Sequence, residues 1–212
     1  MRVALLTSAA LLAGCVQSDR TYFGTVQRAP SNTGEFTQVA ASDTAVFSDG
    51  SGNGYALAYA QVDAQTYNMA GASPDDTAYL AIVGMLPATN VGATPTSGTA
   101  TMTGTYNVLF VERPNSDVAS WVDQTTSSAI SIVFDFNPDV SNGTDGSFTG
   151  SSTDGLLTVS GEFYGLSAHS MDVTYDGVTG YGDIVVGATD AVGIFDGEDD
   201  TMFYVGGFIV TD

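Results

Sequence analysis

The sequence predicts an all-β fold: an antiparallel up-and-down β-barrel of about eight strands, with short extra N-terminal strands and a flexible N-terminal tether. Three observations predict it. Short β-prone segments alternate with turn signals. Outside the first residues, no window shows the 3.6-residue apolar period of an amphipathic helix. Many of the 25 glycines fall inside strand-like runs, where glycine permits the sharp bends of a closed barrel.

Alternation of apolar and polar residues supports the strands. Ile130, Ile132, Phe134 and Phe136 share one face of a segment, and the residues between them form a mixed face. The expected strands are Thr44–Phe47, Tyr55–Tyr59, Ala78–Met85, Thr99–Val111, Ile130–Phe136, Ser147–Thr149, Leu156–Tyr164, Met171–Tyr175, Asp183–Val186, Ala191–Phe195 and Met202–Val210.

Asn-Gly and Asp-Gly pairs mark the expected turns, because a type I′ hairpin needs a positive φ at both central residues. A glycine-rich loop at residues 49–54 is a further expected turn. The pairs are Asn142-Gly143, Asp145-Gly146, Asp154-Gly155, Asp176-Gly177 and Asp196-Gly197.

Residues 1–14 are predicted to be a signal peptide. Arg2 precedes the mostly apolar run Val3–Leu12, which is shorter than the about 20 residues that span a bilayer. Leu12-Ala13-Gly14-Cys15 resembles the lipobox of bacterial lipoproteins, and that resemblance implies a lipidated Cys15. The alternative is an ordinary signal peptide with an incidental cysteine. Several acyl chains on one cysteine would anchor the domain to a membrane without spanning it.

Two segments are expected after the signal. Residues 15–43 are mostly Ser, Thr, Asn, Gln and Gly and are predicted to form a lipidated tether, with room for one short strand. Residues 44–212 are predicted to form the barrel domain. Val16 is not the aspartate that commonly retains lipoproteins in the inner membrane. We therefore expect an outer-membrane location, facing either the periplasm or the cell surface.

The composition limits the partners. The formal net charge is −20, with 24 acidic residues, four arginines and no lysine, so nucleic acid is excluded as a natural partner. The only cysteine is the expected lipidation site, which leaves no disulfide in the mature chain. We expect a monomer without a cofactor.

The second half resembles the β-barrel domain of the transferrin-binding protein B family of bacterial surface lipoproteins. The residues that carry the likeness are Gly104-Thr105-Tyr106, the glycine-flanked Gly146–Gly150, and Gly161-Glu162-Phe163-Tyr164-Gly165 followed by Leu166-Ser167-Ala168. The family pattern is not kept after Ala168. The resemblance covers about residues 99–212 and implies an eight-stranded barrel on a lipid tether, with no particular ligand. The chain has no recognisable handle domain, so no role in host iron is carried over.

Catalytic chemistry finds little support in the residues. His169 is the only histidine and is expected at the surface or rim, and no nucleophile elbow or aspartic-protease motif is present. The acidic runs Asp75-Asp76 and Glu198-Asp199-Asp200 lie in expected loops and are typical of solvated surfaces. We predict that the protein is not an enzyme.

One loop resembles half of a calcium site. Asp49, Ser51 and Asn53 place oxygen atoms at alternate positions, but Ala60 stands where the bidentate acid of an EF-hand would follow. A glycine-rich hairpin turn is the other interpretation, and we predict no metal. A second oxygen-rich loop contains Asp139, Asn142 and Asp145.

Two functions stay open. The first is a non-enzymatic outer-membrane lipoprotein that binds a protein or small-molecule partner through its loops, with Tyr67, Trp121 and Tyr181 as candidate contacts. The second is a structural cell-envelope lipoprotein without a ligand of its own, which would expose a broad apolar patch. Hydrolysis of envelope polymers would need two converging acids, and the sequence identifies no such pair.

Overall fold

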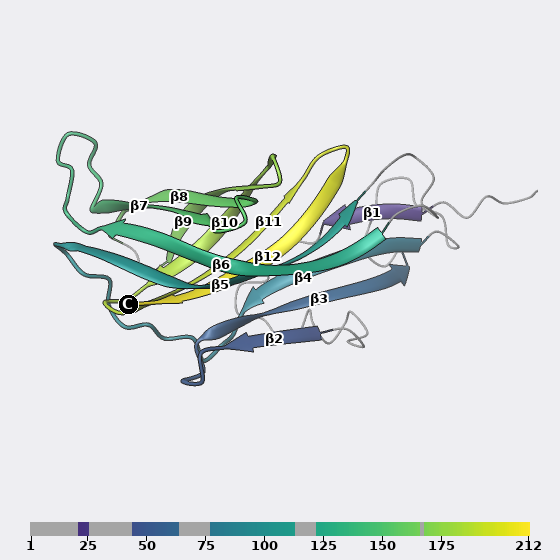
Figure 1. Ribbon diagram of the computed structural model, residues 1–212, viewed down its shortest axis with the longest axis horizontal. Helices are drawn as coiled ribbons and strands as arrows, with labels where there is room; N and C mark the ends of the chain where they lie inside the picture. The colour runs from purple at the N-terminus through teal and green to yellow at the C-terminus, as the bar shows by residue number, and fades with distance from the viewer. Residues whose placement is uncertain (1–20, 26–43, 64–76, 113–121, 166–167) are drawn as a thin grey trace, which may run out of the picture.

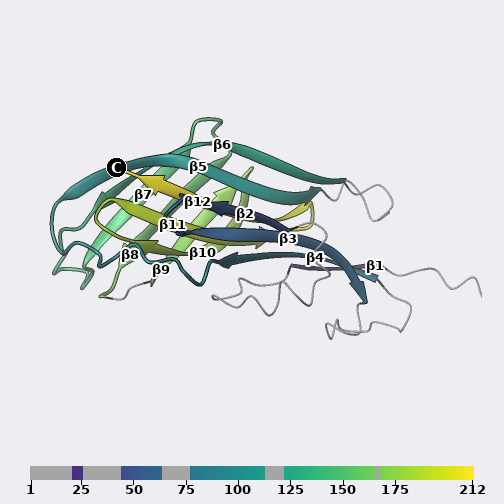
Figure 2. The ribbon, with the colours of Figure 1, turned by 90° about the horizontal axis from the view of Figure 1, so that it is seen from below.

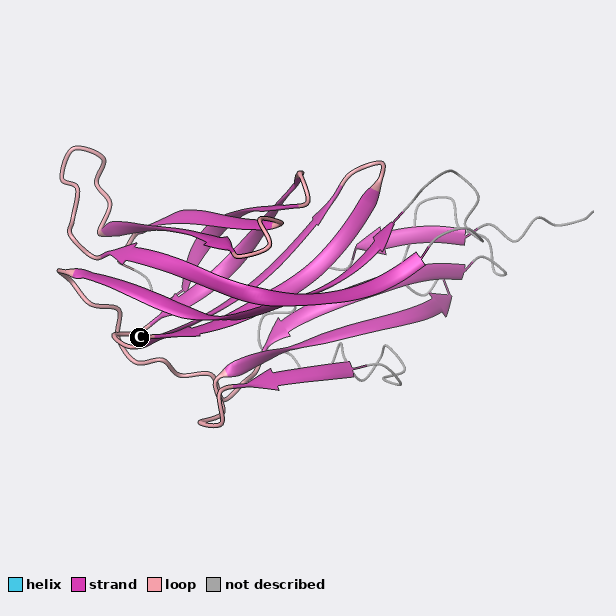
Figure 3. Cartoon of the chain, in the orientation of Figure 1, coloured by secondary structure: helices cyan, strands magenta, loops and turns pink. Residues whose placement is uncertain are grey.

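All the secondary structure that the structure describes is β-strand. The computed structural model describes residues 21–25, 44–63, 77–112, 122–165 and 168–212. These residues form twelve strands joined by loops (Figures 1 and 3). Within those ranges there is no apolar helix of membrane-spanning length.

The second half of the chain is a closed barrel of eight antiparallel strands. The strands follow one another around the barrel in chain order, and the last pairs with the first, with Gly206 of β12 opposite Val108 of β5. The predicted eight-stranded up-and-down barrel is therefore confirmed. The strands are β5 (Thr99–Glu112), β6 (Val122–Asp135), β7 (Gly146–Ser152), β8 (Leu157–Phe163), β9 (Ala168–Tyr175), β10 (Val178–Val186), β11 (Asp190–Glu198) and β12 (Met202–Thr211).

The tightest hairpin has the predicted chemistry. Asp176 and Gly177 join β9 to β10 with φ angles of 46° and 83°, and Tyr175 pairs with Val178 across the turn. A positive φ at both central residues defines the type I′ turn, whose twist suits a two-residue hairpin.

The turn predicted at Asp196-Gly197 is wrong, because both residues lie within β11. Gly197 pairs with Tyr204 of β12, and a Cβ atom on Gly197 would lie 2.5 Å from the tyrosine ring. The same holds for Gly193, where a Cβ would lie 2.3 Å from Cζ of Phe208. These glycines provide the space that a cross-strand aromatic ring occupies.

Inward-facing side chains fill the barrel. Around one end, Phe134, Phe148 and Phe163 pack with ring centroids 5.5–6.4 Å apart. Further along, Tyr175 packs against Tyr204, with centroids 5.3 Å apart. All five side chains are buried, so the barrel has a packed core in its middle.

The N-terminal strands form a separate four-stranded sheet in the order β1-β4-β3-β2. The strands are β1 (Thr21–Thr25), β2 (Thr44–Ser48), β3 (Gly54–Asp63) and β4 (Thr77–Met85). β1 pairs parallel to β4 and lies within the segment expected as a tether.

This sheet covers one side of the barrel. Tyr55 and Leu57 of β3 and Val83 of β4 form one buried apolar cluster with the outward side chains of β5, β11 and β12, and Figure 2 shows β3 and β4 passing across that wall. The outward residues in the cluster are Leu109, Val111, Val192, Ile194, Phe203 and Val205. Since the sheet covers these strands, the opposite wall, β7–β10, presents its outer face to solvent.

Candidate functional site

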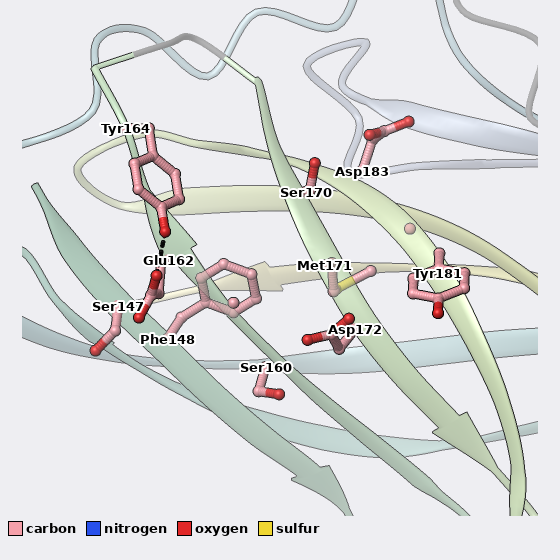
Figure 4. Close-up of a pocket in the computed structure, with 12 residues that line it drawn as sticks. Ser147, Phe148, Ser160, Glu162, Tyr164, Ser170, Met171, Asp172, Tyr181 and Asp183 are labelled. Carbon is pink, nitrogen blue, oxygen red and sulfur yellow. Dashed lines mark hydrogen bonds between the residues drawn. The ribbon is translucent and has the colours of Figure 1, made fainter. Parts of the chain in front are cut away.

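A groove lies on the outer face of β7–β10, the wall that the N-terminal sheet leaves uncovered. Its volume is about 630 Å³. Figure 4 shows Tyr164 and Tyr181 on opposite sides of it, with Phe148, Met171 and Asp172 between them. The remaining lining residues are Ser147, Ser160, Gly161, Glu162, Ser170, Gly182 and Asp183.

The groove forms where two neighbouring strands part. The β8–β9 ladder ends at Ser160 opposite Asp172, although β8 continues to Phe163 and β9 starts at Ala168. Beyond that pair the two strands are not hydrogen-bonded to each other, and residues of both line the groove between them.

Glycine leaves the floor of the groove uncovered and apolar. A Cβ atom on Gly161 would lie 2.5 Å from the ring of Phe148, and one on Gly182 would lie 2.5 Å from Cε of Met171. Phe148 and Met171 point inward and are buried. Because the two glycines have no side chains to cover them, Phe148 and Met171 form part of the groove lining. The floor is apolar, whereas the walls are hydroxyls and carboxylates.

Two tyrosines give the groove exposed aromatic surface. Tyr181 is 61% exposed and Tyr164 is 55% exposed. The hydroxyl of Tyr164 donates a hydrogen bond to the Glu162 carboxylate, and that bond raises the pKa of Tyr164. The carboxylate thus holds this ring at the edge of the groove.

The electrostatics of the groove are negative. Glu162, Asp172 and Asp183 line it, and no basic side chain does. The four arginines of the chain lie outside the described residues, and the chain has no lysine. Carboxylates and aromatic faces together attract organic cations, whereas an anion would meet repulsion from the groove and from the whole chain.

The predicted oxygen-rich loop is a hydrogen-bonded turn between β2 and β3. The Asp49 carboxylate accepts bonds from the backbone and hydroxyl of Ser51, which lower its pKa against the opposing effect of burial. The buried Asn53 donates its amide to Asp49 Oδ2 at 3.1 Å and to Asp190 Oδ2 at 2.9 Å. In this arrangement an amide nitrogen, not a cation, joins the two carboxylates. That this loop binds no calcium stays a prediction.

The expectation that His169 lies at the surface or rim is wrong. Its side chain points into one end of the barrel and is 4% exposed. The physical reason is a distant segment, residues 92–96, which passes over that end of the barrel. Asp145, from the second oxygen-rich loop, lines the same cavity. Asp139 of that loop accepts bonds from Ser141 and Asn142.

Of the other sequence candidates, only Tyr181 is described, and it lies in the groove on a strand rather than in a loop. Cys15, Tyr67 and Trp121 lie outside the described residues. In the part of the chain that is described, no three His, Cys, Asp or Glu side chains come together in a way that would hold a metal.

Sequence reasoning missed the groove carboxylates. Glu162 stands two residues before Tyr164, and Asp183 two residues after Tyr181. Residues two apart in a strand share a face, so each acid lies beside a tyrosine. That spacing was a readable signal, but strand alternation alone does not say that the two pairs face the same groove.

Solved structures with a similar fold include several of transferrin-binding protein B. The intact protein named Ap-TbpB is 11% identical, with a TM-score of 0.44 over 80% of this chain and 37% of its own. A tryptophan-to-alanine mutant from Haemophilus parasuis Hp5 is 13% identical, with a TM-score of 0.45 over 80% and 37%. The isotype 1 protein from serogroup B Neisseria meningitidis is 11% identical, with a TM-score of 0.42 over 81% and 35%.

This chain spans little more than a third of the length of those proteins. They are structures of the family whose barrel domain the second half of the sequence resembles. No family model matches the sequence, and no curated protein does.

Proposed function

We propose that this protein is a non-enzymatic, lipid-anchored outer-membrane protein that binds a basic segment of a protein partner in the groove over β7–β10. One observation carries the proposal: two exposed tyrosines and three carboxylates line one groove on the uncovered wall of the barrel. Pairing of β8 with β7 and of β9 with β10 holds the strands on both sides of the groove in place before a partner arrives, which lowers the entropic cost of binding.

The chemistry of the groove favours lysine or arginine side chains. A guanidinium or ammonium group gains from a carboxylate and from the face of a tyrosine ring, and the groove is lined by both kinds of group, with Glu162 near Tyr164 and Asp172 on the strand next to Tyr181. The net charge of −20 adds long-range attraction that accelerates encounter with a basic partner.

The distribution of exposed apolar side chains favours binding over a purely structural role. Among the described residues, the large exposed ones are Val46, Val133, Val140, Tyr164 and Tyr181. The three valines lie on different parts of the chain, whereas the two tyrosines line opposite sides of one groove. A structural component would need a broad apolar patch on its side.

The anchor and location rest on the sequence. The lipobox-like Leu12-Ala13-Gly14-Cys15 supports lipidation at Cys15, and Val16 supports release to the outer membrane. Protease shaving of intact cells would distinguish a surface-exposed domain from a periplasmic one. A Cys15→Ser chain should leave the membrane fraction, and its retention there would contradict lipid anchoring.

Titration with a basic peptide tests the groove. A short peptide of alternating lysine and tyrosine should shift the amide NMR signals of β8–β10, with an affinity that falls as salt rises. Asp172→Asn should weaken the binding by about threefold to tenfold, as expected for the loss of one ionic partner at a partly solvated site. The matched control, Asp200→Asn, makes the same change of net charge on an exposed turn. Equal weakening by both variants would mean that only overall charge attracts the peptide, and the groove proposal would fail.

A further inference from the structure

A second cavity lies at the end of the barrel, separate from the groove in its lining. Its volume is about 380 Å³, within the range of small-molecule sites. Its walls are mostly apolar or small and come from three distant parts of the chain. The lining includes Pro95, Pro138, Asp145, Phe163 and His169.

His169 is a buried polar side chain that forms no hydrogen bond with the described residues. It is 4% exposed, and neither ring nitrogen has a hydrogen-bond partner among the described residues. Its ring lies edge-on to Phe163, with centroids 4.7 Å apart and planes inclined by 70°. Buried polar groups in folded proteins are nearly always hydrogen-bonded, so an unpaired one on a cavity wall points to a molecule that binds there.

The charge state of the ring defines what it can bind. Burial lowers the pKa of His169, and the nearby Asp145 carboxylate opposes this only in part. The imidazole is therefore neutral at neutral pH and offers one N–H donor and one nitrogen acceptor. His169 and the Asp145 carboxylate can both accept hydrogen bonds from a ligand, and none of the lining residues is a lysine or an arginine.

The cover of the cavity is held in place before any ligand binds. The hydroxyl of Thr94 donates to the backbone oxygen of Val186 at 2.9 Å, and the backbone N–H of Gly98 donates to Asn137 Oδ1 at 3.1 Å. On the far wall, the N–H of Asp145 donates to the backbone oxygen of Phe163 at 2.7 Å. These bonds fix the covering segment and its opposite wall.

We propose that the barrel-end cavity binds a small organic amine with an apolar body. The ammonium group would donate hydrogen bonds to the free nitrogen of His169 and to the Asp145 carboxylate, and the apolar body would pack on Phe163 and the two prolines. Carboxylic acids are disfavoured because Asp145 and the chain's negative charge repel them. This site is independent of the groove and of any protein partner bound there.

Three probes of similar shape and different charge test the proposal: benzylamine, benzyl alcohol and benzoate. Each is titrated into the full-length chain in detergent, and the His169 ring signals are followed by NMR. Benzylamine should bind one to one and most tightly, benzyl alcohol more weakly, and benzoate not measurably. Asp145→Asn should weaken benzylamine by about tenfold and leave benzyl alcohol nearly unchanged, whereas Asp200→Asn should change neither.

Substitution of His169 tests the contribution of the imidazole to this binding. His169→Phe should weaken the binding of benzylamine, because one of the two groups that accept its hydrogen bonds is lost. His169→Gln keeps a side chain that accepts a hydrogen bond and should bind benzylamine more tightly than His169→Phe does. If no probe moves the His169 signals, water alone satisfies the ring and the proposal is overturned. Equal binding of benzoate and benzylamine would overturn it as well. Neither result bears on the peptide titration of the groove.

Discussion

Tyr55 is the side chain that attaches the N-terminal sheet to the barrel. It is fully buried, and its ring lies over Gly207 of β12, where a Cβ atom would be only 2.6 Å from Cδ2 of the tyrosine. Asn107 of β5 donates a hydrogen bond to its hydroxyl at 2.9 Å, and Phe47 stacks on the ring with centroids 5.1 Å apart. Tyr55→Ala would therefore remove two contacts between the sheet and the barrel and one contact within the sheet.

The expected cost follows from these contacts. A fully buried aromatic side chain removes roughly 150–250 Å² from water, which at about 25 cal/mol per Å² is about 4–6 kcal/mol. Aromatic-to-alanine substitutions in cores cost about 3–5 kcal/mol, and we expect Tyr55→Ala to fall in that range. Tyr55→Phe keeps the ring and loses only the bond from the half-buried Asn107, so it should cost about 1 kcal/mol.

Urea denaturation gives both values, and hydrogen exchange locates the effect. Tyr55→Ala should accelerate exchange in β3 and β4 far more than in β7 and β8. Val46→Ala is the matched control on the same sheet, because Val46 is 61% exposed; it should change stability by no more than about 0.5 kcal/mol. If Tyr55→Ala cost no more than Tyr55→Phe, the ring would not carry the interface and the account of the covered wall would be wrong.

Three further outcomes follow from packing, charge and loop geometry. Gly193→Ala should cost about 1–3 kcal/mol in urea melts, since its Cβ would lie 2.3 Å from Cζ of Phe208; an unchanged cost in a Phe208→Leu background would refute the clash. Burial lowers the pKa of His169 in the folded protein. The contribution of the neutral ring to the free energy of unfolding is therefore complete above about pH 6.5, the pKa of an unfolded histidine, and is lost as the pH falls through the lowered native pKa. Thermal melts from about pH 7 to pH 5 should thus show a steeper loss for the wild type than for His169→Phe, and equal slopes would count against a buried neutral ring. Calcium or a chelator should leave Tm unchanged, because hydrogen bonds already satisfy Asp49; a calcium-dependent rise that Asp49→Asn removes would show a metal site.

Local patterns predicted most of the barrel. Apolar alternation identified the core of β5, and β-prone composition identified β12, although β12 is apolar on both faces. Asp176-Gly177 forms the expected hairpin turn. The first half of β6, residues 122–129, was missed because it is nearly all Thr, Ser, Asp and Gln. Its pairing with β5 across Val108 and Thr126, and not its own composition, makes it a strand.

Features that depend on distant contacts were not predictable. Asp196-Gly197 has the composition of a turn, but Tyr204 from the next strand needs the space beside Gly197. His169 is buried because residues 92–96 pass over the barrel end, and the sequence near the histidine carries no sign of that. The tyrosine–acid pairs of the groove could be read as shared faces, but only the parting of β8 from β9 brings them to one site.

Site-specific photo-cross-linking in intact cells tests the binding wall most directly. A photoreactive phenylalanine derivative replaces Tyr181 in the groove or Val133 on β6, which is 47% exposed outside it. Position 181 should capture a defined basic protein, and position 133 should not. Asp172→Asn should reduce the capture from position 181. Equal capture from both positions, or capture from position 181 that Asp172→Asn leaves unchanged, would contradict a partner site on this wall.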